Sequence, residues 1–160
     1  MESFYFFSDT DPEDVQKAIE FINKIEEKAT IYITSNGGDC YAADVLLDTI
    51  NENKDKLTLV ASGKIMSSAF YIFFSAKCNK RIMEGTVGMY HYSGVSVRLT
   101  QSGAFDYEDD EAIIEGMKIE KEINDKWCKD LGMSDKEIKD IKKSKQVFFQ
   151  YDRLLLLLKK

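Results

Sequence analysis

The sequence predicts an α/β fold, in which a mainly parallel sheet carries helices on its faces. Short apolar runs of strand type alternate with amphipathic segments through the first two-thirds of the chain. Gly and Ser residues follow several of these runs, at residues 35–38 and at Gly63. The length of 160 residues suits one domain with a core of its own. Strands that alternate with helices imply right-handed crossovers between parallel strands.

Each expected element follows from a local pattern. Thr10, Asp11 and Pro12 open the first helix with a capping residue and a proline near its first turn, and apolar residues then recur at helical spacing. Gly63 is expected to end the third strand. The expected strands are 4–7, 31–33, 57–61, 81–83, 87–90 and 147–149, and the expected helices are 10–25, 41–50, 67–76, 106–127 and a short one capped by Ser134.

The charge balance argues against binding to nucleic acid. The net charge is −6, and no basic stripe is available to replace the counterions of a phosphate backbone. Lysines gather only between residues 139 and 145, where Asp140 interrupts them, so this cluster is interpreted as a solvated helix face. An apolar share of 44% with 31% charged residues is ordinary for a globular protein.

The cysteine pattern indicates a reducing compartment, and we expect a cytoplasmic protein. Cys40, Cys78 and Cys128 are widely spaced, and the chain has a single histidine, so neither a metal site nor a cofactor is expected. No signal peptide is evident, and no apolar run reaches the roughly 18 residues that a membrane span requires. The five leucines at 154–158 must therefore pack on the core or cover a subunit interface.

Two short motifs and the histidine carry the candidate chemistry. Ser67 follows Gly63 and begins an apolar segment, so a turn there would lift its hydroxyl to the start of a helix. The start of such a helix offers a free backbone N–H to an oxyanion, and the glycine pair that follows a neighbouring strand could supply a second one. His91 is the natural base for a serine at neutral pH and has no competitor in this chain. Each motif alone is weak, because glycine turns and serine caps are common.

Their order and spacing resemble the Clp protease proteolytic-subunit (ClpP) family. That family carries an Asn-Ser-Pro-Gly-Gly turn, a Gly-x-Ala-Ala-Ser nucleophile turn, a Lys-Arg pair and a Met-Ile-His strand. The corresponding residues here are Thr34-Ser35-Asn36-Gly37-Gly38, Gly63-Lys64-Ile65-Met66-Ser67-Ser68-Ala69, Lys80-Arg81 and Met89-Tyr90-His91. The resemblance covers roughly residues 30 to 135 and implies a ClpP/crotonase-like spiral of strand–helix repeats with a protruding handle hairpin and helix.

The resemblance also implies roles and an assembly. Ser67 would attack the peptide carbonyl, His91 would take its proton, and the N–H groups of Gly38 and Ser68 would form the oxyanion hole. Residues 1–92 and 132–160 would form the head of a single domain and 93–131 the handle, with an alternating apolar hairpin at Val95, Val97 and Leu99. Through the handle two rings, favoured as heptameric, would stack into a homo-oligomer that encloses the sites. An AAA+ unfoldase would thread polypeptide substrates in.

The sequence departs from the family pattern in three places. Asn36 replaces the proline of the glycine turn, which a turn tolerates. The first expected strand begins at about Phe4, without the family's pore-lining N-terminal segment, which puts docking of an unfoldase in question. The family's third triad member, an acid, falls at Lys145 or Gln146; Asp140 is the preferred substitute, and Asp152 is the alternative.

We therefore expect a serine endopeptidase that cleaves unfolded polypeptides inside an oligomeric ring chamber. One alternative is a catalytically silent subunit of the same fold, which the displaced acid favours and the intact Ser67, His91 and Gly38 oppose. A second is a phage-type head-maturation protease that acts without an ATPase. An acyl-CoA enzyme of the crotonase type ranks last, because it would not need Ser67 and His91 at these positions.

Overall fold

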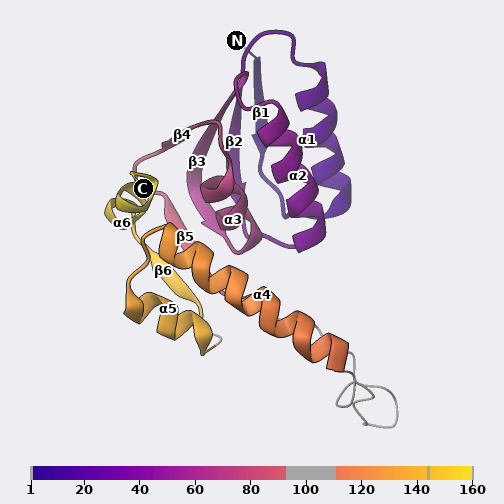
Figure 1. The fold of residues 1–160 in the computed structure, drawn as a ribbon. Helices are drawn as coiled ribbons and strands as arrows, with labels where there is room; N and C mark the ends of the chain where they lie inside the picture. Colours follow the sequence, from indigo (N-terminus) through magenta and orange to yellow (C-terminus); the bar gives the residue numbers. More distant parts are fainter. Residues whose placement is uncertain (1, 93–110, 144, 160) are drawn as a thin grey trace.

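The computed structural model describes residues 2–92, 111–143 and 145–159. The predicted hairpin with Val95, Val97 and Leu99 lies outside these residues. Within them the chain forms one six-stranded sheet and six helices, which confirms the predicted α/β fold (Figure 1). The strands are β1 (Glu2–Phe6), β2 (Ala29–Ser35), β3 (Leu57–Met66), β4 (Asn79–Ile82), β5 (Val87–Tyr90) and β6 (Val147–Phe149), and the helices are α1 (Pro12–Lys24), α2 (Cys40–Glu52), α3 (Ser68–Ser75), α4 (Glu111–Asp130), α5 (Asp135–Lys142) and α6 (Tyr151–Leu158).

The sheet has the order β1-β2-β3-β5-β6, and β4 pairs with β3 outside this path. All pairs are parallel except β5 with β6, which is antiparallel. The first half of β3 pairs with β4 and its second half with β5, so β3 supports both. Because parallel strands end at the same edge of a sheet, the segments that follow β2, β3 and β5 lie close together.

The prediction that Gly63 ends the third strand is wrong. The strand continues through Gly63 to Met66, and Gly63 has a φ of +66°. This conformation is open to glycine at little cost, so the chain bends there without leaving the sheet. The bend falls between Ala61, which still pairs with β4, and Lys64, which pairs with β5. Gly63 therefore marks the change of partner, and the extra strand length carries the chain to Ser67.

Apolar side chains from β5, β6 and α4 pack around helix α3. Phe70 is fully buried, and its ring stacks on Phe149 from β6 at 5.1 Å. It also lies near the rings of Tyr90 and Trp127, at 5.6 Å and 6.4 Å. Helices α1 and α2 cover one side of the sheet, and α4 extends away from it (Figure 1). The strand β5 and the helix α4 are thus both anchored to α3, which begins at the candidate site.

The C-terminal leucines divide between core and surface, as expected for a segment that must pack on something. Leu154 and Leu157 are buried in α6, whereas Leu156 is 55% exposed. Arg153 fixes the helix by an ion pair of 2.7 Å with Glu137 of α5. No helix in the described part of the chain is long and apolar enough to cross a membrane.

Candidate active site

Ser67 occupies the turn between β3 and α3 in a strained conformation. Its φ is +53° and its ψ is −123°, and it is the one non-glycine residue with positive φ in the described ranges. Such a backbone costs on the order of 1–3 kcal/mol and persists only where its surroundings hold it. Here the Ser67 N–H donates to the carbonyl of Met89 at 2.8 Å, and its carbonyl accepts from the Tyr71 N–H at 3.1 Å. A strained strand-to-helix turn of this kind exposes a nucleophilic hydroxyl in other hydrolase folds.

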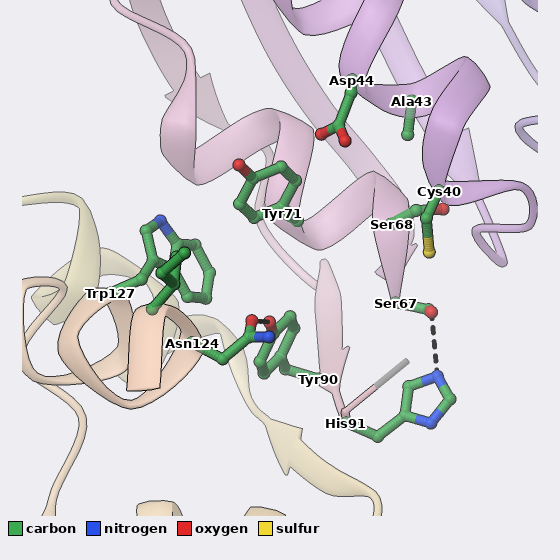
Figure 2. A pocket seen from close by; sticks show the side chains of 11 residues that line it. Cys40, Ala43, Asp44, Ser67, Ser68, Tyr71, Tyr90, His91, Asn124 and Trp127 are labelled. Carbon is green, nitrogen blue, oxygen red and sulfur yellow. Dashed lines mark hydrogen bonds between the residues drawn. The ribbon is translucent and has the colours of Figure 1, made fainter. Parts of the chain in front are cut away.

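His91 directly follows β5 and contacts Ser67. The parallel register pairs Met66 with Met89, so the residues that follow these strands lie at the same edge of the sheet. The His91 Nε2 and the Ser67 Oγ are 2.8 Å apart, and the imidazole is half-buried (Figure 2). This distance is within the reach that a general base needs for a serine hydroxyl. The two residues that the sequence singled out are therefore brought together.

The glycine turn after β2 lies against the Ser67 turn, and Gly37 makes the contact. A Cβ built on Gly37 would lie 2.7 Å from Ser67 Cβ and 3.0 Å from Ser68 N. Gly37 also has a φ of +92°, and its N–H donates to Ser35 Oγ at 3.0 Å. The space before the Ser68 N–H thus exists because Gly37 has no side chain. Gly38 is the glycine predicted to donate to the oxyanion. The glycine that lies directly against Ser67 and Ser68 is its neighbour, Gly37.

Thr10 links this turn to the start of α3, a role that the sequence did not reveal. Its hydroxyl lies 2.7 Å from Ser68 Oγ, and both side chains are buried. The Thr10 N–H donates to the Gly37 carbonyl at 2.9 Å, and a Cβ on Gly38 would lie 3.1 Å from Thr10 N. Asp11, not Thr10, caps α1. Thr10 therefore holds the glycine turn and the helix start at fixed separation.

Two comparisons with known proteins identify relatives of this arrangement. The family model described as Clp protease matches residues 8–151, most of the chain. The chain belongs to the Clp protease family. Members of this family are serine peptidases, and the resemblance to the ClpP family that the sequence indicated is confirmed. A solved structure of a ClpP1 mutant from Listeria monocytogenes is 20% identical, with a TM-score of 0.70 over 98% of this chain and 86% of that one. A comparison with curated proteins found no match.

The predicted third triad residue of this Clp protease family member is Asp140, with Asp152 as the alternative. Asp140 lies in α5, with Lys145 Nζ at 3.4 Å from its carboxylate, and Asp152 is exposed in the first turn of α6. Among the described residues, neither forms a hydrogen bond with His91. The last pair of the β5–β6 ladder joins Tyr90 and Val147, and His91 and Gln146 are the residues next to this pair beyond the ends of the two strands. The role of Asp140 stays a prediction.

Tyr92, next to His91, is held by charged groups of α4 and α5. Its hydroxyl donates a short hydrogen bond to Asp125 of α4, and Lys142 of α5 lies 2.6 Å from the other Asp125 oxygen. Desolvation opposes ionisation of Asp125, yet the hydrogen bonds from Lys142 and Tyr92 lower its pKa from the ordinary value. Asp125 therefore stays charged and holds Tyr92, the residue next to His91.

A cavity of about 240 Å³ opens beside Ser67 and His91 (Figure 2). It lies between α2, α3, β5 and α4, and its walls combine aromatic rings with a few polar groups. Its described lining residues are Cys40, Ala43, Asp44, Ser67, Ser68, Tyr71, Tyr90, His91, Ile123, Asn124 and Trp127. Within the described residues no group of His, Cys, Asp and Glu could hold a metal ion.

Proposed function

We propose that this chain is a serine endopeptidase that cleaves unfolded polypeptides within an oligomeric chamber. The observation that carries the proposal is the 2.8 Å contact between Ser67 Oγ and His91 Nε2 at a strained strand-to-helix turn. A serine next to an imidazole loses its proton as it attacks a carbonyl, and this activation is what a nucleophilic serine requires.

The proposed reaction has two stages. Ser67 Oγ attacks the peptide carbonyl, His91 Nε2 accepts the hydroxyl proton, and the oxyanion is stabilised by the N–H groups of Ser68 and Gly38. The C–N bond then breaks as His91 returns the proton to the leaving amine, which leaves an acyl ester on Ser67. Water, deprotonated by His91, hydrolyses the ester and restores the free serine. No metal or cofactor takes part in these steps.

A fluorophosphonate probe tests the nucleophile directly. We expect the probe to add one phosphonyl group to Ser67, because this hydroxyl alone combines an adjacent base with the oxyanion groups. Mass spectrometry of the intact protein and of its peptides measures the site. Ser67→Ala should remove the label without unfolding the protein, since the change deletes one oxygen. A label that persists in this variant, or that maps to Ser35 or Ser68, would falsify the assignment.

One observation favours a second candidate, a catalytically silent subunit. Gln146 directly precedes β6, beside the Tyr90–Val147 pair that leads to His91; it is an amide, and an amide carries no charge to stabilise an imidazolium. Loss of an orienting acid can reduce the rate of a serine protease about ten-thousandfold. A folded, assembled protein in which Ser67 resists the fluorophosphonate would support this candidate over the peptidase.

We also propose that the chain works as a homo-oligomer of stacked rings, heptameric in the family's manner. Large apolar side chains are exposed on several elements, among them Tyr41 at 85% on α2, Ile119 at 51% and Ile123 at 64% on α4, and Phe148 at 57% on β6. Ile119 and Ile123 are one turn apart on the same face of α4, and adjacent exposed apolar side chains of this kind suit a subunit contact. The AAA+ unfoldase that would supply substrates is part of the same proposal.

Light scattering at micromolar concentration tests the assembly. We expect a particle many times the 18.4 kDa chain mass. Ile119→Glu should lower that mass, because it places a charge on the exposed face of α4, whereas Ile119→Leu should leave it unchanged. A wild-type mass of one chain would contradict the ring and the enclosed chamber together.

A further inference from the structure

The size of the cavity beside Ser67 suits one extended side chain. Its volume of about 240 Å³ is below the roughly 300–1,000 Å³ of pockets that enclose whole ligands. Ser67 and His91 line it directly, so a side chain inside it would belong to the residue whose carbonyl is attacked. The cavity is therefore the place where the peptidase would read the residue that precedes the cut.

Three aromatic rings form a fixed wall of this cavity. The ring of Trp127 lies 5.0 Å from Tyr90 and 5.3 Å from Tyr71. The polar atoms of the wall are anchored as well, because the Trp127 indole N–H donates to Ser75 Oγ at 3.0 Å and the Tyr90 hydroxyl donates to Asn124 Oδ1 at 2.8 Å. Burial raises the pKa of Tyr90, so its phenol stays neutral. Such a wall suits a hydrocarbon stem and, through the ring faces, a cation.

Asp44 supplies a negative charge across the cavity from His91. Its carboxylate projects from α2 toward Tyr71 (Figure 2), and it is the one carboxylate among the described lining residues. In the described part of the chain no Lys or Arg forms an ion pair with it. Burial and then the charge of Asp48, one turn further along α2, raise the pKa of Asp44. Both effects mean that a cation placed near Asp44 would be stabilised.

We propose that this cavity selects lysine or arginine before the scissile bond, with Asp44 as the residue that determines the specificity. The aliphatic stem would lie against Tyr71, Tyr90 and Trp127, and the ammonium or guanidinium group would donate hydrogen bonds to the Asp44 carboxylate. Acidic side chains at the same position would be repelled. This inference rests on the proposed peptidase function, since it names the substrate class of that site.

Three peptidyl diphenyl phosphonates that differ only in the residue bearing the phosphonate test the inference. These residues are the analogues of lysine, of norleucine and of glutamate, and the measured quantity is the second-order rate of Ser67 labelling in the full-length protein. Lysine and norleucine share a stem length and differ in the charge. We expect the lysine probe to react roughly tenfold faster than the norleucine probe, and the glutamate probe to react slowest. Roughly tenfold is the low end of the effect expected for a charged hydrogen bond, because Asp44 is exposed to solvent.

Variants of α2 identify the charge responsible. Asp44→Asn should lower the lysine rate and bring the lysine-to-norleucine ratio close to one, and Asp44→Glu should retain the preference. Asp48→Asn is the matched control, because it removes a charge from the same helix outside the cavity lining, and it should leave most of the preference. Equal lysine and norleucine rates in the wild type, or a ratio that Asp44→Asn does not change, would overturn the inference.

The proposed function and this inference fail in different ways. A small fluorophosphonate without a peptide presents no amino-acid side chain to the cavity, so it reports the nucleophile alone. Labelling of Ser67 by this probe without a preference for lysine would overturn only the role of Asp44. Absence of labelling by any probe would overturn the peptidase proposal and the inference with it.

Discussion

Gly37→Ala is expected to reduce peptidase activity by roughly a hundredfold to a thousandfold, the cost typical of losing one oxyanion donor, because the added Cβ would block the Ser68 N–H. The added Cβ would lie 2.6 Å from the Met66 carbonyl oxygen and 2.7 Å from Ser67 Cβ, so the nucleophile turn must move. It would also lie 3.0 Å from Ser68 N and fill the space where the oxyanion would sit. The measurement is kcat/KM on an unstructured fluorogenic peptide.

Gly85→Ala is the matched control for backbone strain. Gly85 has a φ of +80°, close to the +92° of Gly37, but a Cβ at Gly85 meets nothing within 4 Å. Its cost in the free energy of unfolding should be about 1–2 kcal/mol, and its activity should be kept. Denaturant unfolding of both variants measures the free energy of unfolding, and the comparison separates the cost of backbone strain from the cost of steric overlap with Ser67. If Gly37→Ala retained activity within tenfold, or if Gly85→Ala lost as much, the oxyanion space would have been assigned wrongly.

The sequence predicted those parts of the fold that depend on local pattern. Helix α1 follows from apolar spacing and from Asp11 and Pro12 at its start, and α5 from the capping pair of Ser134 and Glu137. The end of β3 could not be predicted this way. Whether Gly63 stops a strand or bends it depends on the strands alongside, β4 and β5, which the local sequence does not specify.

The candidate site likewise contains some residues that the sequence could predict and others that it could not. Ser67 and His91 could be predicted because each follows a strand, and the parallel register of those strands brings them together. Thr10 could not, since its contact with Ser68 spans 58 residues and depends on how the turn after β1 settles against α3. Asp44 gave no signal for a related reason. From the sequence alone, a carboxylate on an amphipathic helix is interpreted as part of the solvated face. The sequence does not show that Trp127 lies on the opposite wall of the cavity.

Gln146→Asp is expected to raise peptidase activity by about tenfold to a hundredfold. If the antiparallel register of β5 and β6 is continued one residue beyond the Tyr90–Val147 pair, residue 146 faces His91, and a carboxylate there could accept a hydrogen bond from the imidazole Nδ1. That bond fixes the useful tautomer and stabilises the imidazolium that forms when Ser67 attacks. Where a serine protease loses this acid, the rate falls about ten-thousandfold, and a partial recovery is expected because the loop before β6 was not shaped around a charge.

Three matched variants decide which residue orients His91. Gln146→Asn retains an amide and should not raise activity, so it separates charge from side-chain length. Asp140→Asn should have little effect if position 146 is the relevant one, because the described contact of Asp140 is with Lys145. All variants are compared by kcat/KM and by the rate of fluorophosphonate labelling. A large loss in Asp140→Asn together with no gain in Gln146→Asp would instead assign the orienting role to Asp140. The reverse pattern would show that this chain keeps a working nucleophile and base and has exchanged only the acid that orients them.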